Sequence, residues 1–464
     1  MAKNNNIYSG EFGVNNQIYF CGVPFRLDSY SGCSHVCRYC FARSAELTNL
    51  SHLQRQKKVT ESIIPADPAQ LKRKLVIALD QGLKRSDINI EWLRHRVPIH
   101  WGGMSDPFQP CENRYKVTKQ WLEYLNWYNY PVAISTKGTA LATTPEYLQL
   151  LKEGNYVVQV SLITDDPILQ QLEPGVPSPE ERLKHIQIMV DAGLTVMVRI
   201  QPLIPNTVVE HNLGEYITRL GKIGVKHVLT EGYKVQVRQN DWKNEIWQLF
   251  PEAIQEYQQS DIRFEGFELL LSSARKYKYI QIAKQAAHEA GMTYGAADND
   301  MRIYGDTICC CGLDNIKGFE NFWRYQSSQA AVIAKEKGFV TLEDMQQFWD
   351  GGKQSMDSGN ILNNEMYQEV YGYPKGKAKE RDRNKDGGLM SCQAGKMRTE
   401  DRAGGIRYTA KYCVDWMWNN GGSCSPEEIV GLKKDNVDGK VAYRWEDPEN
   451  SLKQKSQVQQ ISLL

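Results

Sequence analysis

Three cysteines near the start of the chain have the types and the spacing for metal chemistry. Cys33, Cys37 and Cys40 stand in Ser-Gly-Cys-Ser-His-Val-Cys-Arg-Tyr-Cys-Phe, which gives the spacing Cys-x3-Cys-x2-Cys with an aromatic residue after the last cysteine. The motif supplies three thiolates rather than four. Soft thiolates suit iron–sulfur clusters, and three of them can hold a [4Fe–4S] cube while its fourth iron stays open. We therefore predict that these three cysteines are metal ligands.

Zinc and a disulfide are the alternatives for these cysteines. A structural zinc site usually takes four protein ligands from paired Cys-x2-Cys knuckles, and no second knuckle with suitable spacing follows in the sequence. A disulfide is not expected, because the opening Met-Ala-Lys-Asn-Asn-Asn lacks the apolar core of a signal peptide. Eleven cysteines in such a chain predict a reducing, cytoplasmic setting and metal or redox chemistry.

The cysteine motif resembles that of the radical-SAM superfamily. The resemblance implies that the open iron chelates the amino and carboxylate groups of S-adenosylmethionine (SAM), and that the reduced cluster releases a 5′-deoxyadenosyl radical from it. Within the superfamily, the chain is similar to the spore photoproduct lyase-like, or DNA-repair photolyase-like, branch. The similarity covers about residues 20 to 235, and the matching stretches are 30–43, 105–112, 134–137, 172–179 and 202–206.

One position departs from the pattern of this branch. Spore photoproduct lyases have a cysteine just before the residues that match Met104, Ser105 and Asp106, and that thiol returns a hydrogen atom to the product radical. Gly103 stands at this place here. The resemblance therefore implies the branch without implying repair of the thymine dimer. Cys111 lies nearby, and we expect it to be a packed, inert cysteine.

The resemblance also implies roles for residues that follow the predicted strands. Asp106 is predicted to be catalytic, because it would meet the methionyl amino group and the adjacent substrate. Ser135 and Lys137 look like contacts to the methionyl carboxylate and the ribose, where a lysine would form a charge-assisted bond. The full set of predicted cofactor-binding residues is Gly102, Gly103, Ser105, Ser135, Lys137, Ser161 and Arg199.

A second cysteine group, Cys309, Cys310 and Cys311, is the other unusual feature. In an extended segment Cys309 and Cys311 would share a face and Cys310 would face the opposite way. Two of them could bind an auxiliary cluster or zinc together with a more distant cysteine (Cys392, Cys413 or Cys424). Alternatively, one thiol donates a hydrogen atom to a carbon radical, or the segment simply packs as a small apolar unit. Cys310 and Cys311 are our candidate catalytic thiols.

The elements that must position these residues alternate β-rich runs with helical stretches, which predicts an α/β fold with a parallel sheet. We expect strands at 24–29, 97–101, 132–135, 156–162, 195–201 and 225–230, and helices at 117–127, 144–152, 179–192 and 212–222. Six such units make a partial (β/α)6 TIM-like barrel of the radical-SAM type, which 265–272, 274–290 and 292–297 could extend or plug. In parallel barrels chemistry lies at the carboxyl ends of the strands, where the candidate residues fall.

We divide the chain into an N-terminal extension (1–20), the barrel with its extension (21–312) and a mostly helical accessory region (313–464). The accessory region should contain helices at 321–338, 341–349 and 408–419, and one that starts at 425. A charged loop near 373–388 carries basic residues that could neutralise phosphates, although acidic residues are interleaved with them. Tyr371 and Tyr373 beside it could stack on bases.

The substrate is less defined than the cofactor. A formal net charge of +1 over 464 residues gives no global attraction to nucleic acid, so any such binding must come from local patches. The resemblance implies a lyase- or isomerase-type enzyme that modifies or repairs a nucleobase in DNA. A radical-SAM enzyme acting on a peptide or small metabolite with an auxiliary cluster is one alternative, and a metal-containing nucleic-acid-binding protein without turnover is another. An electron donor such as flavodoxin or ferredoxin is implied, and no membrane association is expected.

Overall fold

The structure is a computed structural model that describes residues 7, 12–14, 20–43, 63–82, 88–236, 246–257, 263–265, 268–324, 326–348 and 429–447. No helix in these ranges is long and apolar enough to cross a membrane.

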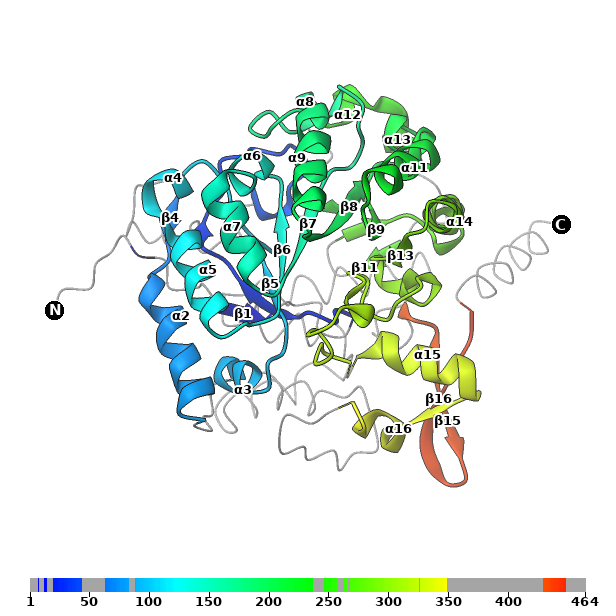
Figure 1. Ribbon diagram of the computed structural model, residues 1–464. Coiled ribbons are helices and arrows are strands. Elements are labelled where there is room, and N and C mark those ends of the chain that lie inside the picture. The colour runs from blue at the N-terminus through cyan, green and yellow to red at the C-terminus, as the bar shows by residue number, and fades with distance from the viewer. Residues whose placement is uncertain are drawn as a thin grey trace, which may run out of the picture.

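A single eight-stranded sheet, in the order β1-β2-β5-β6-β7-β8-β9-β13, forms the centre of the described structure (Figure 1). The edge strand β1 (Phe12–Val14) runs antiparallel to β2, and all the other neighbouring pairs are parallel. The seven parallel strands are β2 (Phe25–Leu27), β5 (Ile99–Trp101), β6 (Val132–Thr136), β7 (Tyr156–Ser161), β8 (Thr195–Leu203), β9 (His227–Gly232) and β13 (Thr293–Ala296). The fold is therefore mixed α/β with a mostly parallel sheet.

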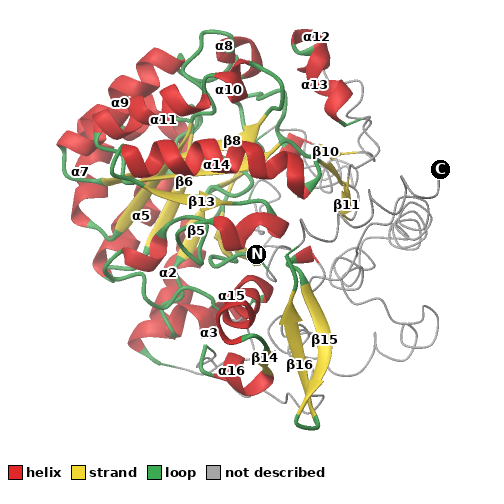
Figure 2. Cartoon of the chain, turned by 90° about the vertical axis from the view of Figure 1, so that its right-hand side faces the viewer, coloured by secondary structure: helices red, strands yellow, loops and turns green. Residues whose placement is uncertain are grey.

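Helices cover the outer face of this sheet (Figures 1 and 2). The longer ones are α5 (Val117–Trp127), α7 (Pro145–Glu153), α9 (Pro179–Asp191), α11 (Leu213–Ile223) and α14 (Ser273–Glu289). The sequence of α11 explains its position, because its buried residues Leu213, Tyr216, Ile217 and Leu220 recur at helical spacing on one face. Helix α9 begins at a capping box in which Ser178 and Glu181 satisfy each other's backbone N–H groups.

Shorter helical segments complete the connections. They are α2 (Pro68–Leu75), α3 (Ile88–Arg94), α4 (Glu112–Tyr115), α6 (Thr139–Ala142), α8 (Leu169–Leu172), α10 (Val208–His211), α12 (Ile246–Leu249) and α13 (Pro251–Glu256), together with η1 (Phe41–Arg43), η2 (Val76–Asp80), η5 (Asn299–Tyr304) and η6 (Leu313–Asn315). The six predicted strands are all present, as β2 and β5 to β9.

The described sheet differs from the predicted six-unit barrel at its far edge. Strand β13 pairs in parallel with β9, so the run 292–297 extends the sheet to seven parallel strands. The run 265–272 does not join it. Its β12 (Glu268–Leu270) lies between β10 (Val235–Gln236) and β11 (Arg263–Glu265) in a separate antiparallel sheet. A run too short to show periodicity cannot reveal which sheet it joins.

The accessory region is mixed rather than mostly helical in its described part. It contains α15 (Ser327–Lys337), α16 (Leu342–Gln346) and the antiparallel sheet β14-β16-β15, formed by Val340–Thr341, Lys440–Trp445 and Leu432–Val437. The predicted helix at 321–338 begins only at Ser327. The charged loop near 373–388, the predicted helix at 408–419, most of the one from 425, and Cys392, Cys413 and Cys424 lie outside the described residues.

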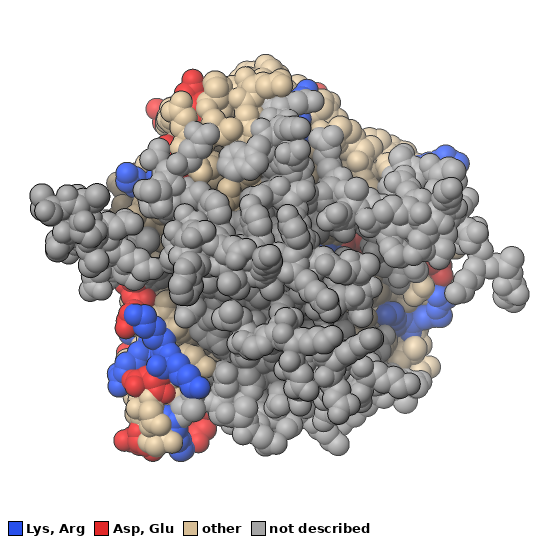
Figure 3. All heavy atoms as spheres, turned by 180° about the vertical axis from the view of Figure 1, so that it is seen from behind, with Lys and Arg blue, Asp and Glu red and all other residues tan. Residues whose placement is uncertain are grey.

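The hairpin β15–β16 carries charges of both signs. In Figure 3 its basic and acidic side chains gather at the lower left of the molecule. Arg444 pairs with Asp435 within the hairpin, Lys433 pairs with Glu446, and Lys440 Nζ lies 2.7 Å from Glu343 Oε1 on α16. Three cations of the hairpin are therefore paired with carboxylates.

Candidate active site

The three cysteines of the N-terminal motif lie on one loop that follows β3 (Tyr30–Ser31), which pairs with β4 (Ile64–Pro65). Cys37 is buried, Cys33 and Cys40 are partly buried, and none of the three is joined in a disulfide among the described residues. Burial is the main reason that the pKa of Cys33 rises to about 12, although the backbone N–H groups of His35 and Asp106 oppose it. Without metal, this thiol is therefore protonated.

The loop after β5 holds the start of the cysteine loop through Gln109. This amide is fully buried. Its Oε1 accepts a hydrogen bond from the backbone N–H of Ser34 at 3.0 Å, and its Nε2 donates to the carbonyl of Gly32 at 3.1 Å. One side chain thus fixes the backbone on both sides of Cys33.

The segment after α8 holds the rest of the loop through backbone contacts. Arg38 N–H donates to Leu172 O at 2.8 Å, and Gly175 N–H donates to His35 O at 3.1 Å. The Nδ1 of His35 lies 3.0 Å from Gly175 O. A Cβ at Gly175 would lie 2.6 Å from His35 O, so only glycine permits this close approach.

Glu173 joins the motif to the barrel. Its carboxylate is fully buried, accepts a hydrogen bond from Tyr39 and forms ion pairs with Arg182 (2.6 Å) and Lys137 (3.7 Å). Burial raises the pKa of Glu173, and Arg182 opposes this effect. Sequence reasoning assigned no role to Glu173, Arg182 or Gln109, although two of them stand in the matched stretches 105–112 and 172–179.

The carboxylate of Asp106 holds backbone and side-chain groups from the end of β6 and from the cysteine loop. Its Oδ2 accepts from the N–H of Lys137 (2.6 Å) and Gly138 (3.2 Å) and lies 3.2 Å from His35 Nε2. Its Oδ1 accepts from Thr136 Oγ1 (2.8 Å) and Phe108 N–H (2.9 Å). Burial alone would raise the pKa of Asp106, but His35 and these donors hold it below its usual value. Both carboxylate oxygens of Asp106 thus accept hydrogen bonds, and its contact with substrate stays a prediction.

The other residues predicted near the cofactor lie at the ends of β5 and β6. Lys137 packs its ammonium over the ring of Tyr39 at 5.6 Å from the ring centroid. Ser105 is buried and donates its hydroxyl to Tyr30 O at 2.7 Å. Gly102 has φ +92°, a conformation that favours glycine, and a Cβ there would collide with Ser135 O. Ser105 and Lys137 thus contact residues that flank or belong to the cysteine loop, whereas Gly102 packs against the end of β6.

A row of polar side chains crosses the inner side of neighbouring strands. His100 Nε2 lies 2.8 Å from Ser135 Oγ, which donates to Gln159 Oε1 at 3.2 Å. Arg199 NH1 donates to the same Gln159 oxygen at 2.8 Å. The row continues through Gln201 to Glu231. We call these six side chains the polar row.

The polar row contains two predicted cofactor ligands, Ser135 and Arg199. Burial, Arg199 and Arg26 lower the pKa of His100 to about 3, so its imidazole is neutral near pH 7. Ser161 pairs in register with Arg199, and its carbonyl accepts from Arg182 NH1 at 3.0 Å. The strand alternation therefore brings the predicted residues of β6, β7 and β8 to one side of the sheet.

Arg26 lies where the expected cysteine is missing. A Cβ at Gly103 would be 2.8 Å from Arg26 Cδ and 3.8 Å from His100 Nδ1. The guanidinium itself pairs with the buried Asp28, at 2.8 Å from Nε to Oδ2. Gly103 thus makes room for an arginine, and a thiol at this position would compete with it for space.

Cys309, Cys310 and Cys311 form a buried plug against the inner face of the sheet. The segment consists of bends and turns rather than the expected extended strand, so all three side chains can be buried together. They pack in one apolar cluster with inward-facing strand residues, which are Ala133, Val157, Met197 and Leu229. Cys311 Sγ lies 3.9 Å from Arg199 NH1, so this thiol borders the polar row.

The plug consists of neutral thiols. A hydrogen bond with Cys309, together with burial, raises the pKa of Cys311 to about 12. In the described part of the chain, no group of three or more His, Cys, Asp or Glu side chains is arranged to hold a metal ion. In a [4Fe–4S] cluster each thiolate binds a different iron, so its three ligands do not have to converge on a single metal ion. The first loop, to which the same finding applies, supplies three thiols, the number that such a cluster takes from the protein when one iron stays open. The role of the plug as a thiol donor stays a prediction.

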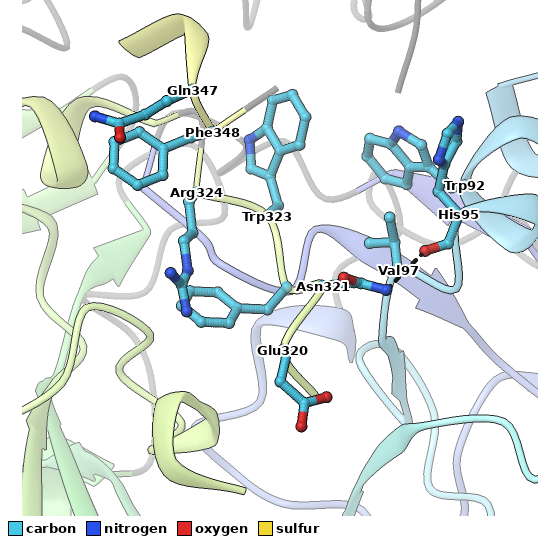
Figure 4. Close-up of a pocket in the computed structure, with 10 residues that line it drawn as sticks. Trp92, His95, Val97, Glu320, Asn321, Trp323, Arg324, Gln347 and Phe348 are labelled. Atoms are coloured by element: carbon cyan, nitrogen blue, oxygen red, sulfur yellow. Dashed lines mark hydrogen bonds between the residues drawn. The ribbon is translucent and has the colours of Figure 1, made fainter. Parts of the chain in front are cut away.

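A separate pocket of about 170 Å³ lies between α3, the segment 320–324 and the residues that end α16. Figure 4 shows Trp92 and Trp323 facing one another across it. Asn321 Nδ2 donates a hydrogen bond to the backbone carbonyl of His95 at 3.2 Å. The predicted site residues do not line this pocket, so it is distinct from the candidate active site.

Comparison with known proteins gives distant relatives. No protein-family model matches the chain. An uncharacterized protein of Mycobacterium tuberculosis is 29% identical over 232 residues, which are 47% of this chain and 62% of that protein. An uncharacterized protein of Methanocaldococcus jannaschii is 21% identical over 53% of this chain and 90% of its own length. A protein of Pseudomonas phage M6 described as a radical SAM Nalpha-GlyT isomerase is 23% identical over 42% of this chain and 41% of that protein. The chain thus spans less than two thirds of its mycobacterial relative.

Two solved structures match part of the chain at low sequence identity. A spore photoproduct lyase mutant with bound AdoMet and dinucleoside spore photoproduct is 13% identical, with a TM-score of 0.44 over 60% of this chain and 79% of that one. Streptococcus suis SuiB bound to S-adenosylmethionine is 16% identical, with a TM-score of 0.35 over 51% of this chain and 48% of that one.

Proposed function

We propose that this protein is a radical-SAM enzyme in which Cys33, Cys37 and Cys40 hold a [4Fe–4S] cluster. The observation that carries the proposal is the single loop that bears all three cysteines, fixed by hydrogen bonds from two different parts of the barrel. The similarity to the phage protein named as a radical SAM isomerase supports it. When bound, the cluster supplies an electron to SAM, and the resulting 5′-deoxyadenosyl radical takes a hydrogen atom from the substrate.

The chain's own residues have distinct tasks in this proposal. Gln109, Glu173 and Gly175 keep the three sulfurs in place, so that metal loading does not have to order the loop. Asp106 fixes the backbone N–H groups of Lys137 and Gly138 at the end of β6. Lys137 brings a cation beside the loop, where an anionic carboxylate of SAM would be stabilised. Ser135 and Arg199, in the polar row, would contact the rest of the cofactor.

The plug offers the hydrogen-atom donor that Gly103 lacks. Cys311 is a neutral thiol beside the polar row, so it could return a hydrogen atom to a substrate radical in the barrel. Cys310 is the second candidate, because it is buried in the same plug, where a hydrogen bond with Cys311 and burial raise its pKa and keep the thiol neutral. For the substrate we propose a nucleobase in DNA, changed by a lyase- or isomerase-type reaction. Electrons would come from flavodoxin or ferredoxin.

The first experiment is anaerobic reconstitution with iron and sulfide, followed by iron counting and an assay for 5′-deoxyadenosine with SAM and dithionite. We expect about four irons per chain and 5′-deoxyadenosine from the wild type. A Cys33/Cys37/Cys40→Ala variant should bind no iron and produce no 5′-deoxyadenosine, whereas Cys111→Ala should match the wild type in both. Zinc in place of iron, or no cleavage of SAM, would contradict the proposal. About eight irons would instead favour an auxiliary cluster and a peptide or small-molecule substrate.

A further inference from the structure

Buried polar side chains without partners lie at the start of the eleven-residue helix α15. Gln326 precedes the helix and Ser327 and Ser328 open it, and these three residues are at most 2% exposed. The Oγ atoms of both serines, and both amide atoms of Gln326, have no hydrogen-bond partner in the described part of the chain. Burying an unpaired polar group costs free energy, and such groups normally have a partner. These side chains therefore need a partner that the described residues do not supply.

The backbone N–H groups at this helix start also lack a capping side chain. The first N–H groups of an α-helix have no acceptor within the helix, and a capping side chain often satisfies one of them. Gln326 occupies the capping position of α15, but its side chain makes no capping hydrogen bond. Because Cα–Cβ bonds tilt toward the N-terminus of a helix, the Cβ atoms of Ser327 and Ser328 lean to the end where these N–H groups point. Such a donor-rich end favours an anion, above all a phosphate.

Arg324 adds a cation next to this helix start. Its backbone carbonyl accepts the N–H of Gln326 at 2.9 Å, so Arg324 lies directly before the first turn. Its guanidinium packs over the ring of Phe322, with Cζ 4.4 Å from the ring centroid, and its Nε has no hydrogen-bond partner among the described residues. A guanidinium donates hydrogen bonds in a fixed fork that matches a phosphate. The charge of Arg324 and the donors of α15 therefore suit the same ligand group.

Arg324 also lines the pocket of about 170 Å³ (Figure 4). Aromatic side chains form much of the wall of this pocket, from Trp92, Phe322, Trp323 and Phe348. Trp92 is 2% exposed, and its Nε1 is a donor without a partner among the described residues. A cavity of about 150 Å³ is large enough for benzene, so this pocket has room for one flat ring system. Aromatic walls with a few polar groups are suited to a nucleobase.

The two tryptophans of the pocket do not form a slot for that ring. Their centroids lie 6.0 Å apart with the rings tilted by 35°. A base inserted between them would need two van der Waals contacts, or about 7 Å in all. The base would therefore pack against the aromatic wall of the pocket, with the indole N–H of Trp92 as a donor for its polar edge.

We propose that the start of α15 and the adjoining pocket form a nucleotide-binding site. The helix N-terminus with Ser327 and Ser328 holds the phosphate, Arg324 pairs with it, and the aromatic pocket takes the base. The site goes beyond the proposed function, because the predicted site residues do not line this pocket. A free nucleotide and a nucleotide within a strand present the same base and phosphate, so the binding assay has to distinguish these two sources.

The test is isothermal titration calorimetry on the full chain without metal or SAM, at constant ionic strength set with chloride. The probes are inorganic phosphate, deoxyguanosine monophosphate and a single-stranded hexadeoxynucleotide. We expect the wild type to bind the mononucleotide more tightly than phosphate. Ser327→Ala/Ser328→Ala and Arg324→Gln should each weaken the binding of both by roughly tenfold or more, because each removes donors to a charged group. Trp92→Phe, which keeps an aromatic ring without the N–H, should weaken only the mononucleotide.

Two controls separate this site from the rest of the chain. Ser273 opens α14 as Ser327 opens α15, but its hydroxyl already donates to Asp300 Oδ2 at 2.7 Å. Ser273→Ala should therefore bind all three probes as the wild type does. The Cys33/Cys37/Cys40→Ala variant should also bind them normally. A loss of binding in that variant would place the nucleotide at the candidate active site and would overturn the inference.

Thermal unfolding of the ligand-free chain gives a second readout. Because the hydroxyls of Ser327 and Ser328 have no described partner, Ser327→Ala/Ser328→Ala should keep the melting temperature or raise it. Ser273→Ala should lower it, since Asp300 loses a buried donor. A lower melting temperature for the double variant would show that its hydroxyls have a structural partner, and would overturn the inference.

The strand and the mononucleotide identify the source of the ligand. Tighter binding of the hexadeoxynucleotide would identify a nucleic-acid strand, and tighter binding of the mononucleotide would identify a free nucleotide. Either result supports the inference. No binding of any probe by the wild type, equal binding by the wild type and the double serine variant, or a mononucleotide bound no better than phosphate would overturn it.

Discussion

Glu173→Gln gives a sharp test of how the cysteine loop is held. Glu173 and Arg182 are both fully buried and lie 2.6 Å apart. Removing one partner of such a pair leaves an uncompensated buried charge, which typically costs about 3–5 kcal/mol. Because the glutamine oxygen still accepts one hydrogen bond, we expect the free energy of unfolding to fall by about 3 kcal/mol, the low end of that range.

The assay is urea unfolding of the metal-free chain, followed by circular dichroism. The control is Glu180→Gln, which breaks the ion pair with Lys184 on the same helix. These side chains are 79% and 67% exposed, so we expect a loss of at most about 0.5 kcal/mol. Adding Arg182→Met to Glu173→Gln should recover part of the lost stability, because it removes the orphaned charge. A loss no larger than that of Glu180→Gln would refute the assignment of Glu173 as the buried anchor of the loop.

Three further predictions concern neighbouring residues. Burial lowers the pKa of His227 to about 4, so the free energy of unfolding of the wild type should fall by about 1.4 kcal/mol per pH unit as the pH falls from about 6.5 to 4. His227→Gln should flatten this slope in urea titrations. An unchanged slope would contradict the assignment. Because the pKa of Asp106 is lowered, Asp106→Asn should be about 1–3 kcal/mol less stable than the wild type above pH about 4. This difference in stability should disappear as the pH falls through the pKa of Asp106. A difference that persists in acid would contradict the prediction. Gly175→Ala should lower the free energy of unfolding by about 1–3 kcal/mol and reduce the iron bound after reconstitution. Gly214→Ala should do neither, because its Cβ would meet Ile282 at an ordinary 3.6 Å. Full iron loading of Gly175→Ala would show that the close approach of Gly175 to His35 is not needed for metal binding.

The sheet could be predicted from the sequence because its parallel strands are mostly short, buried runs, and β5, β6, β7 and β8 are each followed by a helix. The same pattern placed Ser135, Ser161 and Arg199 correctly on neighbouring strands, since alternation and register are regular. The far edge of the sheet was less certain because β13 has only four residues.

The supports of the cysteine loop could not be predicted in the same way. Gln109 and Ser34 are separated by 75 residues, and Glu173 and Tyr39 by 134. An isolated glutamine or glutamate has no periodicity that reveals its partner. The hydrogen-bond partners of Asp106 could not be predicted for a related reason. Its residue type fits catalysis, but its five donors come from three separate segments, and this becomes visible only in three dimensions.

The plug has a consequence for how the chain is made. The ribosome synthesises the inward-facing residues long before Cys309 to Cys311, which cover them; these residues are Ala133, Val157, Met197 and Leu229. A nascent barrel that ends before residue 309 therefore leaves an apolar lining exposed, and such intermediates are prone to aggregation. Shortened expression fragments that stop after β9 should for this reason accumulate as inclusion bodies, whereas fragments that extend past residue 323 can cover their own interior.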